Sequence, residues 1–294
     1  MTQSDLRARA IALYDRFTHE GRDRRAFMRQ LTLLAGSAAA ANALLAGIAA
    51  DPAAAAIVAP DDKRVKAETT ILGTSGAGRP LNGYRATPAK GRPGKALVVV
   101  IHENRGLNDH IRDVARRFAL AGFTAVAPDF LTPAGGTPAD EDQARDMIGK
   151  LVLADTVADG VGLVRWLAGA EGGSHAVGVV GFCWGGGMVN RLAVASGDAL
   201  KGAVSYYGPA PDPAEAARVE TPLILQLAGL DQRVNATAYP WAQALAGAGK
   251  RVTVHNYPGA NHAFNNDTSA ERYDKAAATL AWDRTVAFFR ETLK

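Results

Sequence analysis

Short apolar runs alternate with longer amphipathic stretches from about residue 96 to the end of the chain. The run at residues 96–101, Ala-Leu-Val-Val-Val-Ile, is continuously apolar, as a strand buried on both faces must be. Six segments of this kind are predicted to be strands: residues 96–101, 124–127, 176–180, 202–207, 222–226 and 251–256.

Amphipathic segments between these runs predict helices, which are expected at residues 108–120, 142–152, 155–167, 184–195, 239–246 and 269–293. In the first of them Asn108 can cap the helix, while Ile111, Val114 and Phe118 share one face. Strands separated by helices of this length imply right-handed crossovers and a mostly parallel sheet. Two earlier alternating segments, residues 65–72 and 81–86, flank a Gly-rich stretch and predict an antiparallel hairpin. The expected fold class is therefore α/β.

The first 60 residues or so have a different composition. Arg24-Arg25-Ala26-Phe27-Met28-Arg29 fits the twin-arginine export pattern, and an Ala-rich stretch and small residues suited to cleavage near residues 50–56 follow it. Three alternatives remain open: an export signal that is removed, a retained amphipathic or membrane-touching helix, and an ordinary cytosolic helix. Gly, Ser and Asn within residues 31–50 argue against a true transmembrane anchor. We expect residues 1–56 to form a signal or anchor segment with a linker, residues 63–294 to form the folded domain, and the protein to be periplasmic or exported, with the cytoplasm as the alternative.

Composition narrows the functional classes. The chain has 294 residues, 48% hydrophobic and 21% charged, which suits one large soluble domain or two small ones. The formal charge is +4 and the Lys and Arg residues form no basic run, so nucleic-acid binding has little support. A single cysteine cannot form an internal disulfide and leaves a free thiol to be explained.

That cysteine stands in the sequence Gly181-Phe182-Cys183-Trp184-Gly185, between a predicted strand and a predicted helix. The pattern is that of a nucleophile elbow, in which a sharp turn pushes the middle residue into a strained, exposed position. Glycines two residues before and after are needed because a Cβ there would collide with neighbouring backbone. The alternative is a small buried hydrophobic cysteine, which does not explain the flanking glycines.

Other reactive side chains follow other predicted strands, where ligands bind in an open parallel sheet. Glu103 follows the strand at 96–101, Asp231 follows that at 222–226, and His262 follows that at 251–256. The chain order of nucleophile, acid and histidine matches that of α/β-hydrolases. Taken alone, Asp231 is equally well explained as a turn or N-cap residue. The alternative for His262 is a surface histidine, which is the less favoured interpretation.

The chemistry gives each group a role. Cys183 would attack an acyl carbon to form a thioester, His262 would carry the proton, and Asp231 would hold the other ring nitrogen. The backbone N–H groups of Trp184 and Asn104 would bind the oxyanion.

The remaining histidines carry no visible site. His102 is interpreted as a spectator or a hydrogen-bond donor behind the site, and His110, His175 and His255 show no metal-ligand spacing, so no metal or organic cofactor is expected. Arg105 and Arg233 are solvated charges or contacts for an anionic substrate.

Several segments together resemble the dienelactone hydrolase family of α/β-hydrolases, over residues 65–293. The matching segments are H-E-N-R-G-L at 102–107, D-V-A-R-R at 113–117, V-A-P-D at 126–129, G-F-C-W-G-G-G at 181–187, Y-Y-G at 206–208 and N-H-A-F at 261–264. The resemblance implies an α/β-hydrolase fold, hydrolysis of esters or lactones of the carboxymethylenebutenolidase class, and a triad of Cys183, Asp231 and His262. It also implies that Glu103 is a fourth participant, which takes the thiol proton when substrate displaces it.

The resemblance is incomplete at the substrate-binding positions. Family members that open dienelactones bind the substrate carboxylate with arginines, one of them shortly after the catalytic histidine, whereas residues 263–267 here read Ala-Phe-Asn-Asn-Asp. Arg105, Phe264 and Tyr207 are the expected substrate contacts instead. The expected partner is a small-molecule ester or lactone, with no nucleic acid, no membrane partner beyond export machinery, and an open oligomeric state. Acyl transfer to another acceptor and a non-catalytic binding protein on the same fold are the alternatives.

Overall fold

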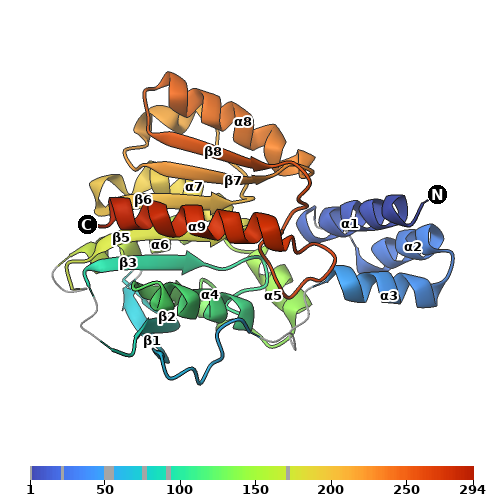
Figure 1. Ribbon diagram of the computed structural model, residues 1–294, viewed down its shortest axis with the longest axis horizontal. Helices are drawn as coiled ribbons and strands as arrows, with labels where there is room; N and C mark the ends of the chain where they lie inside the picture. Colours follow the sequence, from blue (N-terminus) through green and yellow to red (C-terminus); the bar gives the residue numbers. More distant parts are fainter. Residues whose placement is uncertain (1, 21–22, 50–55, 75–77, 91–93, 170–172) are drawn as a thin grey trace.

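A central eight-stranded sheet organises the protein in a computed structural model that describes residues 2–20, 23–49, 56–74, 78–90, 94–169 and 173–294. Its strands occur in the order β1-β2-β4-β3-β5-β6-β7-β8 (Figure 1). Their bounds are β1 Val65–Thr74, β2 Pro80–Pro88, β3 Ala96–Ile101, β4 Thr124–Pro128, β5 Ala176–Phe182, β6 Leu200–Tyr206, β7 Leu223–Ala228 and β8 Val252–Tyr257. Strands β3 to β8 are parallel to one another, and β2 joins them antiparallel through β4. The predicted α/β class and hairpin of β1 and β2 are confirmed, although residues 75–77 of its turn lie outside the described residues.

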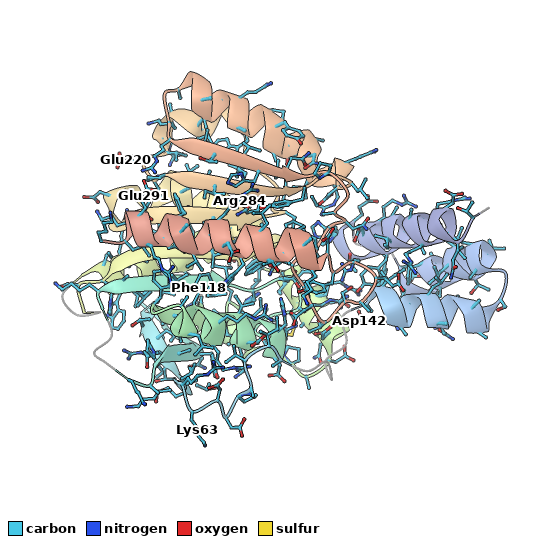
Figure 2. All side chains as sticks on the ribbon, viewed as in Figure 1. Lys63, Phe118, Asp142, Glu220, Arg284 and Glu291 are labelled. Carbon is cyan, nitrogen blue, oxygen red and sulfur yellow. The ribbon has the colours of Figure 1, made fainter. Side chains whose placement is uncertain are left out.

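Helices cover both faces of the sheet. They are α4 Asp109–Leu120, α5 Glu141–Ile148, α6 Leu153–Ala168, α7 Trp184–Ala195, α8 Gln232–Gly247 and α9 Lys275–Thr292, with short 3-10 turns at Thr132–Ala134, Gly197–Ala199 and Pro213–Arg218. Val98 and Val100 of β3 pack with α4 and α9, while Leu97, Val99 and Ile101 pack with α6, α7 and α8. Phe118 lies on the α4 side (Figure 2). Its ring centroid is 4.5 Å from that of Trp282 on α9. Because helices cover both faces of β3, apolar side chains are favoured at every position of this strand.

Two helix starts differ from the predictions. Helix α8 begins at Gln232 rather than at residue 239, because the Asp231 carboxylate accepts from the N–H of Val234 and caps it. Helix α9 begins at Lys275 rather than at residue 269, because Asp274 accepts from the N–H of Ala277 in the same way. The residues between β8 and Asp274 form turns, and these turns carry His262.

The N-terminal segment forms three helices, α1 Gln3–His19, α2 Arg24–Ala35 and α3 Ala38–Ile48, which we call the cap. Their apolar side chains form a separate cluster of Ala10, Ile11, Leu13, Tyr14, Phe17, Phe27, Leu31, Ala41 and Ile48. At its centre the rings of Phe17 and Phe27 stack 4.5 Å apart. No single described helix is long and apolar enough to cross a membrane. Helices α2 and α3 meet these two criteria only when they are taken together, and they are bent by 108° at the break between them. The predicted cleavage region falls largely on residues 50–55, outside the described residues.

The cap lies beside the carboxyl ends of the parallel strands, and the arrowheads of β3 and β7 point toward α1 (Figure 1). Its last helix is held by backbone groups: the Ile48 carbonyl accepts from Ser269 Oγ at 2.6 Å and from Arg272 Nε at 2.9 Å. The N–H of Glu271 donates to the Gly47 carbonyl at 3.0 Å. The loop between β8 and α9 therefore carries both His262 and the seat of the cap.

Candidate active site

The elbow places Cys183 between β5 and α7. Its backbone has φ 55° and ψ −113°, a conformation that residues other than glycine rarely adopt. A Cβ at Gly181 would lie 2.3 Å from the carbonyl oxygen of Gly185, and one at Gly185 would lie 2.4 Å from that of His102. Both glycines are therefore required by the close approach of backbone, as predicted.

Asp231 and His262 meet at the ends of β7 and β8. Asp231 Oδ2 lies 2.5 Å from His262 Nδ1, while its Oδ1 caps α8, so the N-cap role and the orienting role are both filled by one carboxylate. A ring nitrogen of His262 lies within 4.8 Å of the Cys183 sulfur. Since Nδ1 is held by Asp231, Nε2 is the nitrogen left for the thiol, and it is buried with no hydrogen-bond partner among the described residues.

The electrostatics of this pair favour charge. Burial opposes a positive charge on His262, but the neighbouring Asp231 carboxylate and Cys183 sulfur raise its pKa to about 10. Burial likewise opposes the charge of Asp231, but His262 lowers the pKa of that carboxyl through its charge and hydrogen bond. A protonated His262 beside the sulfur is a counter-ion for a thiolate.

Glu103 lines the same small cavity as Cys183 and His262. Its Oε2 accepts from Asn266 Nδ2 at 2.8 Å, and its Oε1 is buried with no hydrogen-bond partner among the described residues. The Asn266 amide is oriented because its Oδ1 accepts from the N–H and hydroxyl of Thr268. Sequence reasoning missed Asn266; the only signal was its position four residues after His262.

His102 supports the loop that carries Glu103. Burial lowers its pKa, so its Nδ1–H donates to the Glu103 carbonyl at 2.7 Å and its Nε2 accepts from the N–H of Phe130 at 3.3 Å. Its ring stacks on Trp184, 5.1 Å away and 8° from parallel. Trp184 is the first residue of α7, so its N–H has no carbonyl in the preceding turn of the helix and is free to face an oxyanion.

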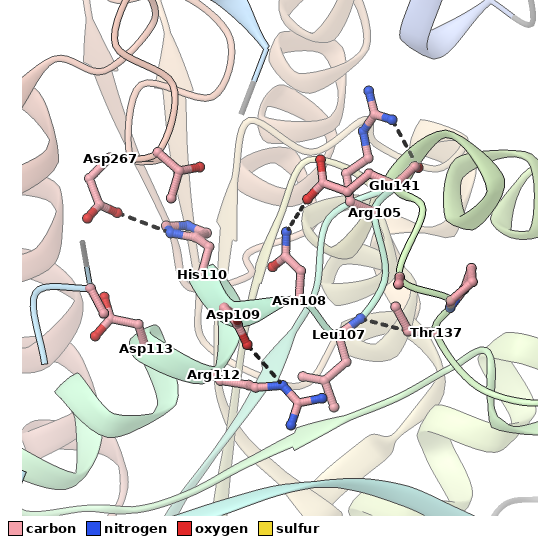
Figure 3. A pocket seen from close by; sticks show the side chains of 14 residues that line it. Arg105, Leu107, Asn108, Asp109, His110, Arg112, Asp113, Thr137, Glu141 and Asp267 are labelled. Atoms are coloured by element: carbon pink, nitrogen blue, oxygen red, sulfur yellow. Dashed lines mark hydrogen bonds and ion pairs between the residues drawn. The ribbon is translucent and has the colours of Figure 1, made fainter. Parts of the chain in front are cut away.

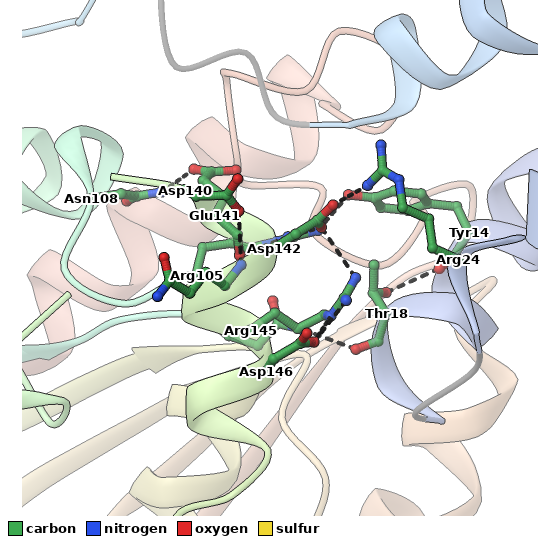
Figure 4. Close-up of polar contacts among 12 residues, drawn as sticks. Tyr14, Thr18, Arg24, Arg105, Asn108, Asp140, Glu141, Asp142, Arg145 and Asp146 are labelled. Carbon is green, nitrogen blue, oxygen red and sulfur yellow. Dashed lines mark hydrogen bonds and ion pairs between the residues drawn. The ribbon is translucent and has the colours of Figure 1, made fainter. Parts of the chain in front are cut away.

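Asn104 and Arg105 contact the cap. Asn104 Nδ2 donates to the Thr18 carbonyl at 3.1 Å, and Arg105 donates to the Tyr14 hydroxyl at 3.0 Å and forms an ion pair with Asp142 at 2.8 Å (Figure 4). The Arg105 guanidinium is thus already paired, and its contacts with Asp142 and Tyr14 link α5 to α1. Arg105 also lines the small cavity that contains Cys183 and His262, and its contact with an anionic substrate stays a prediction.

Tyr207 and Phe264 differ from their predicted role as substrate contacts. Both side chains have 0% exposure, and the rings of Tyr207 and His262 lie with centroids 5.1 Å apart. Phe264 packs on Tyr207 at 5.3 Å. Neither residue lines the pockets that contain Cys183, and Tyr207 packs against the His262 ring.

Three pockets surround these residues. A pocket of about 330 Å³ opens beside Cys183 and Trp184; its other lining residues are Thr18, His19, Asn104, Arg145, Ile148, Gly149, Leu151, Leu153, Thr156, Pro209 and Arg233. A cavity of only about 20 Å³ lies between α1 and the catalytic groups. A pocket of about 390 Å³ beside α4 is lined by polar residues such as Asn108 and His110 and does not include Cys183 (Figure 3).

The same fold occurs in known proteins. The model of the dienelactone hydrolase family matches residues 81–293. The chain belongs to this family. The predicted resemblance is confirmed, and with it the expectation that this family member is an enzyme that hydrolyses ester or lactone bonds.

Relatives of this family member span nearly its whole hydrolase domain. A protein of Escherichia coli O157:H7 named "Putative carboxymethylenebutenolidase" is 31% identical over 258 residues, which are 83% of this chain and 93% of the relative. "Protein usf" of Aquifex pyrophilus is 35% identical to this chain, and the match covers 72% of this chain and 94% of that protein. A Klebsiella pneumoniae crystal structure titled "Putative Dienelactone Hydrolase" matches with a TM-score of 0.68 and 28% identity, covering 77% of this chain and 99% of that one.

Proposed function

We propose that the protein hydrolyses a small ester or lactone with Cys183 as the nucleophile, through a thioester. The observation that carries this proposal is the 2.5 Å contact of Asp231 with His262 beside a cysteine held in a strained turn. A buried structural cysteine has no need of that turn or of an oriented imidazole.

The steps follow from the positions of these groups. Cys183 Sγ attacks the acyl carbon, the carbonyl oxygen takes the negative charge, and the N–H groups of Trp184 and Asn104 face it. The bond to the leaving oxygen then breaks as His262 gives that oxygen its proton. Water attacks the thioester and His262 accepts a proton from it, the C–S bond breaks to release the acid and a thiolate, and Glu103 then returns to the sulfur the proton that it took before the attack.

Glu103 acts in the proposed mechanism before the attack. Its free Oε1 shares the cavity with the Cys183 thiol, and Asn266 holds its Oε2. We propose that substrate binding displaces this carboxylate toward the thiol, from which it takes a proton. The nucleophile then becomes fully ionised only when an acyl group is present.

The pocket of about 330 Å³ is the proposed substrate site, because it reaches both the sulfur and Trp184. Ile148, Leu151 and Leu153 give it an apolar wall, which suits the hydrocarbon part of an ester. Among the described residues, two guanidinium groups line this pocket, those of Arg233 and Arg145. The geometry therefore favours small esters or lactones in general over a substrate recognised by a dedicated carboxylate clamp.

Alkylation tests the nucleophile directly. Treatment with iodoacetamide should modify Cys183 and abolish hydrolysis of a p-nitrophenyl ester in proportion to the modified fraction. A bound, slowly hydrolysed ester should protect the thiol. Full activity in the completely alkylated protein would exclude the proposed nucleophile.

We also propose that residues 1–56 direct export by the twin-arginine route and stay attached afterwards as the cap. The arginine pattern supports the first part, and the hydrogen bonds of Ile48 and Gly47 to the hydrolase domain support the second. N-terminal sequencing of protein from the periplasmic and cytoplasmic fractions tests both. Periplasmic protein that begins at residue 2 or earlier is expected, whereas protein that begins near residue 56 would exclude retention.

A further inference from the structure

The cap brings a third reactive side chain to the catalytic thiol. His19, the last residue of α1, has Nδ1 and Nε2 each 3.9 Å from Cys183 Sγ. Its ring centroid lies 4.8 Å from that of His262. His19 lies outside the segment that the family model matches, so it is a feature of this chain's N-terminal extension.

His19 presents both ring nitrogens beside the thiol. An imidazole is a common metal ligand. One thiolate and two imidazoles form a donor set that Zn²⁺ prefers, with a fourth position left open.

We propose that His19, Cys183 and His262 form a binding site for one Zn²⁺ ion, and that α1 supplies the ligand that completes it. One ligand atom of each residue lies within 4.8 Å of the others. A tetrahedral site with ordinary Zn–S and Zn–N lengths needs S···N distances of about 3.5 Å. The His19 nitrogens at 3.9 Å exceed this by a few tenths of an ångström, and pairs near the 4.8 Å limit of the group must close by about 1 Å when the ion binds.

The surroundings fit a single ion. The cavity among these residues measures about 20 Å³, and about 10–15 Å³ already holds one water-sized group. His262 Nε2 is buried without a hydrogen-bond partner among the described residues, at a side chain only 2% exposed. Asp231 holds the other nitrogen of that ring, which is the second contact that metal-bound histidines commonly make.

Binding has a chemical consequence that rests on the proposed function. Zn²⁺ displaces the protons of the Cys183 thiol and of the His262 imidazolium, and it takes the sulfur lone pair that would attack the acyl carbon, so the metal-bound enzyme cannot form a thioester. Zinc is then a reversible inhibitor, and removal of the ion by a chelator restores the thiol. The cap makes the inhibition stronger, because it adds a ligand that the hydrolase domain lacks.

A metal titration of the full chain tests the site without reference to turnover. Zn²⁺ is titrated by calorimetry, and Co²⁺ is titrated while the sulfur-to-cobalt charge-transfer band is followed. We expect one ion per chain, a band that disappears in Cys183→Ala, and affinity at least ~100-fold weaker in His19→Ala, since loss of even an outer partner costs 10–100-fold. His255→Ala on β8, which is outside the site, is the matched control and should bind like the parent protein.

His19→Gln provides a second variant of similar size, and circular dichroism of each variant verifies folding. Equal affinity of the parent protein and both His19 variants, or no binding at one equivalent, would overturn the proposal. The two proposals fail separately. An inactive Cys183→Ala enzyme whose parent binds no zinc refutes only the metal site, whereas zinc binding that depends on His19 in an enzyme that needs no Cys183 refutes only the nucleophile.

Discussion

The hydrolase domain and the cap bury apolar residues in different ways. In the domain, one sheet carries two layers of core, and strands such as β3 contribute to both. In the cap, three helices bury a small cluster of their own, and polar contacts attach it: Ile48 to Ser269, Tyr14 to Arg105, and Arg24 to Asp142. The hydrogen bonds of Ile48 and Tyr14 are buried and the Arg24–Asp142 pair is exposed, and polar contacts of either kind contribute less than a shared apolar core. The cap should therefore open without unfolding the domain.

The two regions also divide the chemistry. Cys183, Asp231, His262 and Glu103 all come from the domain, at the ends of strands in one sheet. The cap adds His19, which closes the small cavity over the sulfur. The difference suggests that the domain performs the reaction and the cap controls what reaches the thiol.

The largest expected effect is that of Cys183→Ala. Without the nucleophile, turnover of a p-nitrophenyl ester should fall at least ~10³-fold, because only binding and oxyanion stabilisation remain. A cooperative urea-unfolding transition should show that the variant is folded. An activity within tenfold of the parent's would place the chemistry elsewhere.

Asp231→Asn should lower kcat by about 10²–10⁴-fold, because the ring tautomer of His262 is no longer fixed. The amide still accepts from the N–H of Val234, so α8 keeps its cap and the thermal midpoint should change little. Steady-state kinetics and a melting curve on the same sample check both statements. A large fall in the midpoint would mean that the carboxylate is mainly structural.

Glu103→Gln should slow acylation about 10²-fold, since the group that takes the thiol proton is lost. The amide can still face Asn266, so stability should change far less than rate. Burst kinetics separate acylation from deacylation. Unchanged acylation would remove Glu103 from the mechanism.

Phe17→Ala and Phe118→Ala compare the two regions directly. Each removes a buried ring, which costs about 3–5 kcal/mol. We expect Phe17→Ala to speed amide hydrogen exchange only within residues 3–48, whereas Phe118→Ala should lower protection throughout the sheet and α4. Equal loss in both regions would show that cap and domain unfold as one unit.

The smallest effect concerns pH. Because the pKa of His262 is raised to about 10, its pairing with Asp231 stabilises the fold fully below the unfolded value of about 6.5 and loses that effect as pH rises toward 10. The difference in unfolding free energy between the parent and Asp231→Asn should therefore be largest near pH 6 and shrink toward pH 10. A difference that grows with pH would contradict the assignment.

The sequence was sufficient to predict the domain because its information is local. Apolar runs mark the buried strands, and the glycines around Cys183 mark the elbow. Asp231 was less certain, since a cap and an orienting carboxylate look alike in sequence; the structure shows one residue in both positions. Local sequence patterns could not predict the contacts of Arg105, because its partners Tyr14 and Asp142 are distant in the chain.

The cap could not be predicted in the same way. An Ala-rich stretch after two arginines has the same composition whether it is an export signal or a packed helix, and only long-range contacts distinguish them. His19 lies 164 residues from Cys183 in the sequence, with no motif linking them. Asn266 belongs to no motif, and its amide meets Glu103, 163 residues away in the sequence, only in the folded chain.

Trapping the acyl-enzyme tests the central claim most directly. The His262→Ala enzyme, in which hydrolysis of the thioester should be slowed, is mixed with p-nitrophenyl acetate, quenched in acid and examined by intact and peptide mass spectrometry. We predict one acetyl group per chain, located on Cys183 and removed by hydroxylamine, and none on the protein from His262→Ala/Cys183→Ala. An acetyl group on another residue, or nitrophenol release by the parent enzyme that persists after Cys183→Ala, would contradict the account.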